Sequence, residues 1–237
     1  GNMITVRVDG RILQNELAYA ICGDERLKAE IIKIEEGTAS LQVYESTRGL
    51  RAGDQVEFSG QMLFVRLGPG ILGQVYDGLQ NPLHELAKQH GFFLRRGKTA
   101  DPLDRVRKWM FRPEAKEGDV VLSGMALGRV QENAVRHSIM VPFTIRGECT
   151  VKSIVPEGQY TIEQQVAEVV DEAGVVHSLT MCFDWPIKLP IKAYRRKLVS
   201  DEPMVTQYRI IDTFSPVPLG GTYCIPGPFG AGKTVLQ

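Results

Sequence analysis

The segment LKAEIIKIEEGTASLQV, residues 27–43, contains two stretches in which apolar and polar residues alternate, separated by a Glu36-Gly37 turn. Alternation with a period of two is typical of β-strands. Residues 4–8 alternate in the same way, residues 62–67 form an apolar strand-like run, and glycines separate these segments. Many short strands with glycine turns predict a small closed barrel, since closure removes exposed strand edges. We therefore expect a six-stranded-type β-barrel over residues 1–70.

A second set of strand signals lies between residues 118 and 187. Residues 160–170 and 175–183 are expected to form a hairpin around the Asp-Glu-Ala-Gly turn at 171–174. Residues 117–128 resemble the barrel-sandwich hairpins of lipoyl and biotin carriers, although the 123–126 tip lacks the lysine that such carriers modify. The chain is thus predicted to be mainly β, with a second, barrel-sandwich-like domain inserted over residues 113–186.

Residues 71–112 are expected to link the two β domains. Residues 82–89 predict one short helix, with Pro82 at its first position and Gly91 at its exit. Between Arg95 and Arg112, basic side chains clearly outnumber Asp101 and Asp104. This composition indicates a solvated connector or, alternatively, a contact surface for an acidic neighbour.

Composition excludes several classes of function. The 237 residues carry 28 basic and 28 acidic side chains, so no net charge attracts the chain to nucleic acid or to an anionic membrane. Hydrophobic residues make up 43% of the chain and charged residues 24%, as in soluble globular proteins. No apolar run approaches the roughly 20 residues of a membrane helix, and the start has no signal-peptide pattern. We expect a cytosolic protein without direct membrane insertion.

Cysteines and histidines give no metal or disulfide signal. The widely spaced cysteines predict reduced thiols, with Cys224 buried, and the histidines are expected on the surface or in packing roles. These residues are Cys22, Cys149, Cys182 and Cys224, and His84, His90, His137 and His177.

Residues 227–234 fit the phosphate-binding pattern G-x-x-x-x-G-K-[ST] and follow an expected short buried strand at 222–225. The glycines let successive N–H groups turn inward around an anion, and the N-terminus of the following helix adds partial positive charge. Lys233 is predicted to contact the β- and γ-phosphates as the catalytic residue, and the Thr234 hydroxyl to bind Mg²⁺. The predicted ligands are ATP or ADP with Mg²⁺, and the predicted phosphate-binding residues are Gly227, Pro228, Phe229, Gly230, Ala231, Gly232, Lys233 and Thr234.

This loop predicts that residues 187–237 are the truncated start of an α/β P-loop NTPase domain. The sequence stops at Gln237, so the helix that should frame the loop barely begins. An acidic strand for Mg²⁺, a glutamate that orients water and a downstream arginine are also missing. We expect the chain to be the front part of a longer protein and to be inactive in ATP hydrolysis by itself.

Several segments resemble, in the same order, the N-terminal part of the catalytic A subunit (alpha chain) of V-type and archaeal-type rotary ATPases. The phenylalanine-containing phosphate loop and the extra β region before the nucleotide domain are the specific marks. Asn81 departs from the pattern, because the family usually has arginine at this position. The resembling segments are QVYESTRGL at 42–50, LGPGILGQVYDGLQNPL at 67–83, PEGQYTIE at 156–163, Trp185-Pro186, and residues 220–235.

The resemblance implies a subunit that alternates with B subunits in an A3B3 hexamer, in the cytoplasmic headpiece of a membrane-bound complex. ATP hydrolysis or synthesis at the A–B interfaces would drive protons or sodium ions across the membrane through a rotating stalk. The implied partners are B subunits and the central and peripheral stalk subunits, without nucleic acid. The first barrel would help to form the ring, and the inserted domain would be an outward arm.

Two alternatives remain open at this point. A hexameric RNA helicase of the termination-factor type also places a small β-barrel before a phosphate loop. Its barrel would normally show aromatic residues among basic ones. The aromatic residues here are instead scattered among acidic ones: Tyr19, Tyr44, Phe58 and Phe64. The other alternative is a piece that acts only as an assembly scaffold.

Overall fold

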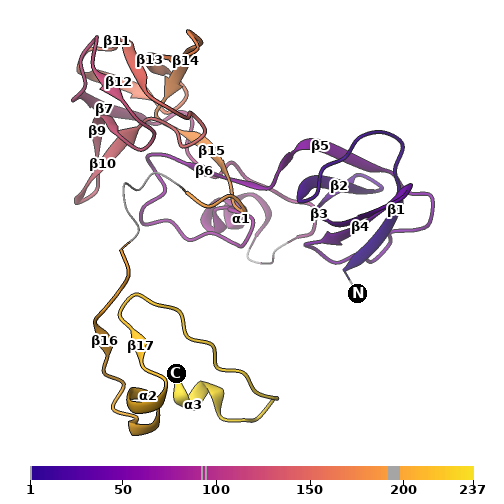
Figure 1. The fold of residues 1–237 in the computed structure, drawn as a ribbon. Coiled ribbons are helices and arrows are strands. Elements are labelled where there is room, and N and C mark those ends of the chain that lie inside the picture. Colours follow the sequence, from indigo (N-terminus) through magenta and orange to yellow (C-terminus); the bar gives the residue numbers. More distant parts are fainter. Residues whose placement is uncertain (1, 92, 94, 192–197) are drawn as a thin grey trace. The chain divides into compact units, whose positions relative to one another are not determined.

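The computed structural model describes residues 2–91, 93, 95–191 and 198–237. The chain divides into two compact units, residues 1–193 and residues 194–237, and each is described by itself (Figure 1). No described helix is long and apolar enough to cross a membrane.

The first sheet has five antiparallel strands in the order β1-β4-β3-β2-β5. Strands β3 and β4 confirm the two predicted strands, with Leu27, Ala29 and Ile31 buried on one face and Ile32 and Ile34 exposed on the other. Strand β2 gave no alternation signal, because its sequence ELAYAIC is apolar at successive positions. The strands are β1 (Met3–Arg7), β2 (Glu16–Cys22), β3 (Glu25–Glu35), β4 (Thr38–Val43) and β5 (Val56–Met62).

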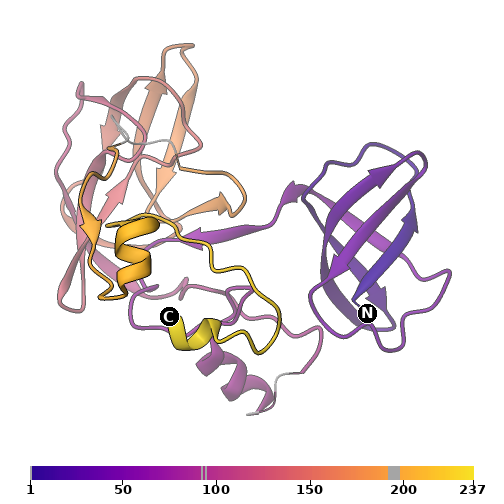
Figure 2. The same cartoon turned by 60° about the horizontal axis from the view of Figure 1, so that its bottom comes forward.

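The sheet curls without forming a ladder between its two edges (Figure 2). Edge strands β1 and β5 line one cavity of about 660 Å³, to which Ile4, Val6, Val56 and Phe58 contribute side chains. Among the described residues no sixth strand joins this sheet, although a six-stranded type was expected. The reason is that β6 (Phe64–Leu67), within the segment predicted at 62–67, pairs with β15 (Phe183–Pro186) instead.

Strands β6 and β15 bring together segments that are far apart in the sequence (Figure 1). Arg66 donates to both carboxylate oxygens of Asp184, from Nε at 2.8 Å and from Nη2 at 3.0 Å. Such bidentate pairs are among the stronger charge-assisted hydrogen bonds. After this stem, helix α1 (Leu83–His90) confirms the predicted helix with a shift of one residue. Pro82, expected at the first helical position, is the N-cap, and the helix ends before Gly91 as predicted.

The second β region consists of two four-stranded antiparallel sheets, β10-β9-β7-β12 and β14-β13-β11-β8. The first contains β7 (Lys108–Pro113), β9 (Ala126–Glu132), β10 (Val135–Met140) and β12 (Gly158–Thr161). The second contains β8 (Val120–Val121), β11 (Cys149–Ile154), β13 (Gln165–Asp171) and β14 (Val176–Thr180). This arrangement agrees with the predicted barrel-sandwich architecture.

Two apolar clusters form the core of this region. Phe111, Leu127 and Ile162 are fully buried. Strands β7 and β9 approach so closely that a Cβ atom on Gly128 would lie 2.5 Å from the carbonyl oxygen of Arg112 and 2.6 Å from the Phe111 ring. Only glycine fits at that position, because real Cβ contacts are longer.

Two predicted segments differ from the structure. The strand expected over residues 160–170 is interrupted after Thr161, where the Gln164 side chain accepts a hydrogen bond from the Thr161 amide at 2.7 Å and forms a turn. The expected hairpin around residues 171–174 is present as β13 and β14. The basic connector ends earlier than expected, since Trp109 and Phe111 are buried and make residues 108–113 a core strand.

The C-terminal unit contains short elements. Among its described residues only Ile211 and Val217 are buried. Residues 222–225, expected as a buried strand, are not a strand and are mostly exposed. No described strand lies beside them to accept their backbone hydrogen bonds. The elements are β16 (Pro203–Met204), α2 (Arg209–Phe214), β17 (Val217–Pro218) and α3 (Lys233–Leu236).

Candidate functional site

The eight predicted phosphate-binding residues form one exposed loop that leads into α3. Gly230 and Gly232 have φ angles of 81° and 75°, in the left-handed region that favours glycine. The Ala231 amide donates to the Pro228 carbonyl at 3.3 Å, and the amides of Val235 and Leu236 donate to the Gly232 carbonyl. The two left-handed glycines thus turn the chain into the first helical turn.

Most amide groups of this loop have no acceptor within the described part of the chain. The N–H groups without one are those of Gly227, Phe229, Gly230, Gly232, Lys233 and Thr234. A run of free amides around left-handed glycines is chemically suited to an oxyanion, which accepts several hydrogen bonds at once. The donor set therefore fits a phosphate group.

Lys233 folds back over the start of the loop. Its Nζ donates to the Gly227 carbonyl at 2.7 Å. This contact ties the lysine side chain to the first residue of the loop, and a Cβ atom on Gly227 would lie 3.7 Å from Cδ of Lys233. The lysine charge and the free amides thus belong to the same short segment.

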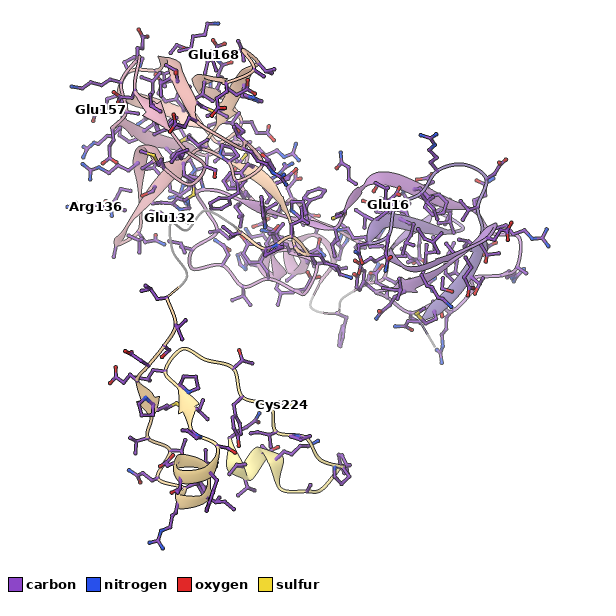
Figure 3. The ribbon with its side chains drawn as sticks, viewed as in Figure 1. Glu16, Glu132, Arg136, Glu157, Glu168 and Cys224 are labelled. Atoms are coloured by element: carbon purple, nitrogen blue, oxygen red, sulfur yellow. The ribbon has the colours of Figure 1, made fainter. Side chains whose placement is uncertain are left out.

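The remaining predicted site residues are accessible to solvent. The Thr234 side chain is exposed, and among the described residues its hydroxyl has no hydrogen-bond partner. Phe229 is fully exposed at the tip of the loop. Cys224, expected to be buried, is exposed because residues 222–225 do not join a sheet (Figure 3).

A carboxylate organises the other half of this unit. Asp212 Oδ1 accepts hydrogen bonds from the Thr206 hydroxyl at 2.6 Å and from the Thr206 amide at 3.0 Å, and Oδ2 accepts one from the Gln207 amide at 3.0 Å. The Thr206 hydroxyl, followed by these amides, lowers the pKa of Asp212. Asp212 therefore stays ionised and holds the turn that precedes α2.

Two histidines differ from the expected surface or packing roles. His137 Nδ1 lies 2.5 Å from Oε2 of the buried Glu132, whose Oε1 accepts the amides of Gly70 and Leu72 at 2.8 and 2.9 Å. His177 Nε2 lies 2.8 Å from Oδ2 of Asp171. Hairpins bring these pairs together, and sequence spacing alone gave no sign of them. Within the described residues no group of three or more potential metal ligands occurs.

The basic stretch 95–112 does not form one patch. Arg96 Nε donates to Glu25 at 2.9 Å, and Arg105 pairs with Asp101 at 2.8 Å. Arg107 lies over the ring of Trp109, with its guanidinium carbon 3.9 Å from the centroid. Arg112 pairs in register with Arg129 and lines a hollow together with Arg129 and Arg136, which come from later strands. Sequence reasoning missed this group.

Comparisons with known proteins agree with this architecture. Residues 1–60 match the beta-barrel domain of the ATP synthase alpha/beta family, and residues 100–188 match the ATP synthase alpha/beta subunit barrel-sandwich domain. Both matches lie in the two β regions described above. The chain therefore belongs to the ATP synthase alpha/beta family.

The similarity to individual relatives is more specific. The V-type ATP synthase alpha chain of Borrelia hermsii is 54% identical over all 237 residues, which cover 41% of that protein. The V-type ATP synthase alpha chains of Treponema denticola and Borreliella burgdorferi (strain ZS7) are 54% and 51% identical, again over the whole chain, which covers 40% and 41% of them. Within its family the chain is thus a homologue of V-type ATP synthase alpha chains and spans about two fifths of their length.

Proposed function

We propose that this chain is the N-terminal part of the catalytic subunit of a rotary ATPase, which couples ATP hydrolysis or synthesis to proton or sodium transport across a membrane. The observation that carries the proposal is the loop at 227–234, which combines amides without an internal acceptor with a lysine side chain that folds back to the Gly227 carbonyl. Homology to V-type ATP synthase alpha chains also supports the proposal.

The proposed roles follow from the chemistry of the loop. The amides of residues 229–234 that have no internal acceptor would bind the β- and γ-phosphates of ATP or ADP, and Lys233 would neutralise their charge. Lys233 would exchange its contact with the Gly227 carbonyl for a phosphate oxygen. Thr234 would bind Mg²⁺ through its hydroxyl, and the metal would supply further positive charge to the phosphates.

Assembly and location belong to the same proposal. The subunit would alternate with B subunits in an A3B3 hexamer and contact central and peripheral stalk subunits, at the cytoplasmic side of the membrane and without nucleic acid. We propose the division into residues 1–70, 71–112, 113–186 and 187–237, with the change that residues 108–112 belong to strand β7 of the second β domain. The RNA-helicase alternative has no support from the comparisons, which match the ATP synthase alpha/beta family.

Residues 1–237 alone are proposed to be inactive. Phosphoryl transfer to water needs a residue that orients the attacking water. The candidate acidic groups of the C-terminal unit are Asp201, Glu202 and Asp212. Asp212 is already engaged by Thr206 and Gln207. Measurable ATP hydrolysis by these residues alone would contradict this part of the proposal.

The test uses the full-length subunit assembled with its partner subunits. Lys233→Ala should lower ATP turnover by about a hundredfold or more and weaken nucleotide binding, because the charge on the transferred phosphate loses its partner. Arg209→Ala is the matched control, since Arg209 is an exposed cation on α2 of the same unit. Equal activity of the Lys233→Ala complex and the control complex would refute the assignment. Normal assembly with no nucleotide binding even in the unmodified complex would instead favour a scaffold role.

A further inference from the structure

A group of arginines surrounds a hollow on the outer face of the sheet β10-β9-β7-β12. The hollow has a volume of about 360 Å³ and is lined by Met110, Arg112, Arg129, Val130, Gln131 and Arg136. Three strands supply its guanidinium groups: β7 supplies Arg112, β9 supplies Arg129 and β10 supplies Arg136. Figure 3 labels Arg136 on β10 and Glu157, which directly precedes β12.

The strand register places like charges side by side. Arg112 on β7 is the direct partner of Arg129 on β9, and Arg136 on β10 is the partner of Gln131, two residues further along β9. Like charges at directly opposite positions of a sheet destabilise it. Packing does not require arginine here, since all three side chains are on the exposed face.

The arginines keep most of their hydrogen-bonding capacity. Arg112 contacts Glu157 through Nε at 2.9 Å, and Arg129 contacts Glu114 through Nε at 3.1 Å. Within the described residues, the Nη groups of both side chains have no acceptor, and Arg136 has neither an ion pair nor a side-chain hydrogen bond. A guanidinium group has five N–H donors, so each arginine can bind a further anion.

We propose that this hollow, named here the arginine hollow, binds a phosphate-type oxyanion with at least two negative charges. A guanidinium fork matches the geometry of phosphate oxygens and can bind two of them at once. A carboxylate has only two oxygens and one negative charge, so it cannot bind three guanidinium groups at once as well as a phosphate can. The site is separate in sequence from the loop at 227–234 and does not depend on the function proposed for that loop.

The test titrates residues 1–237 carrying Lys233→Ala, which removes the lysine of the other candidate phosphate site. Inorganic phosphate, pyrophosphate and ADP are added separately at about 0.15 M ionic strength, where nonspecific attraction is screened. Calorimetry measures the affinity, and NMR follows the arginine Nε–Hε signals. We expect pyrophosphate to bind and to shift the signals of Arg112, Arg129 and Arg136. Binding of ADP with similar affinity would identify a diphosphate group on a larger molecule as the ligand, whereas binding of pyrophosphate alone would identify the free anion.

Two variants separate a built site from general electrostatic attraction. Arg136→Gln should weaken pyrophosphate binding about tenfold, because one charge-assisted contact is lost. Arg146→Gln removes the same charge from an exposed position of the same β region outside the hollow, and its affinity should stay within about twofold. Arg136 is exposed, so its substitution should not disturb folding. If a variant nevertheless folds poorly, the NMR signals of the three arginines in the chain without arginine substitutions still show whether pyrophosphate binds in the hollow. Absence of pyrophosphate binding, or equal weakening by the two variants, would overturn the proposal.

Discussion

The barrel-sandwich region, residues 108–180, and the C-terminal unit, residues 198–237, contain similar short apolar segments with different outcomes. Residues 149–154 pair on both sides, with β13 and with β8. Residues 222–225 have comparable apolar character but remain without strand partners in the described chain. The difference shows that a short apolar segment becomes a strand when neighbours can accept its backbone hydrogen bonds and cover its side chains.

The same contrast affects the two candidate anion sites. The arginine hollow lies on a sheet whose opposite face is buried, so the strand register fixes the positions of its residues. The loop at 227–234 is exposed throughout, and local contacts such as Lys233 with Gly227 maintain its shape. We therefore expect changes in the core to affect the first region strongly and the C-terminal unit weakly.

The largest expected difference comes from equal truncations in the two regions. Phe111→Ala removes a fully buried ring and should lower the free energy of unfolding of the barrel-sandwich region by about 3–5 kcal/mol. Phe214→Ala removes a ring that is 80% exposed and should change stability by less than about 0.5 kcal/mol. Urea denaturation followed by backbone amide NMR signals from each of the two regions measures both. Equal losses in the free energy of unfolding for the two variants would show that the difference in burial does not determine stability.

A smaller effect is expected at the buried carboxylate of the first unit. Glu132→Ala leaves the amides of Gly70 and Leu72 without their acceptor and should cost about 3 kcal/mol. Glu132→Gln should recover part of this loss, since an amide oxygen also accepts hydrogen bonds. Glu117→Ala, at an exposed position of the same region, is the control and should cost less than about 0.5 kcal/mol. Thermal denaturation compares the three variants, and a cost for Glu132→Ala equal to that of Glu117→Ala would contradict the role of Glu132.

The smallest expected effect is on pH dependence. The His177 side chain, followed by the Val175 amide, lowers the pKa of Asp171, whereas Thr206 lowers the pKa of Asp212. Because each folded pKa lies below the unfolded value of about 3.9, the stabilisation by each carboxylate is present above that pH. It is lost as the pH falls through the folded pKa.

Carboxyl ¹³C NMR titration tests this point in both regions at once. His177→Gln should raise the pKa of Asp171 toward its ordinary value and leave the pKa of Asp212 unchanged. An unchanged Asp171 titration in this variant would show that the amides of Ala173 and Val175 suffice to keep the carboxyl ionised.

Sequence patterns predicted the elements that depend on local signals. The alternating segments around Glu36-Gly37 and the helix between Pro82 and Gly91 are examples, since each carries its own turn or terminus residue. Strand β2 was missed because apolar residues on both faces remove the alternation. The pairing of β6 with β15 could not be predicted, because it joins segments whose separation in the chain gives no local signal.

One of the two candidate sites could be proposed from the sequence, and the other could not. The loop at 227–234 could be proposed as a site from the sequence because all its candidate donor groups come from consecutive residues. The arginine hollow was missed because Arg112, Arg129 and Arg136 meet only through the register of three strands. Charge counting over residues 95–112 even suggested a different surface, since it could not foresee that Arg96 and Arg105 have acidic partners within the same chain.

The antiparallel stem of β6 and β15 has a consequence for how such a chain can change in evolution. The backbone leaves the stem at Leu67 and returns at Phe183, which are paired neighbours, so a short turn can join the two strands. The barrel-sandwich region between these strands could then be exchanged, lengthened or lost while Arg66 and Asp184 still pair at its base. Loss of the linker as well would also remove the contact of Arg96 with Glu25 of the first sheet. A single insertion or deletion could thus add or remove the barrel-sandwich region without changing the strand order of the preceding sheet.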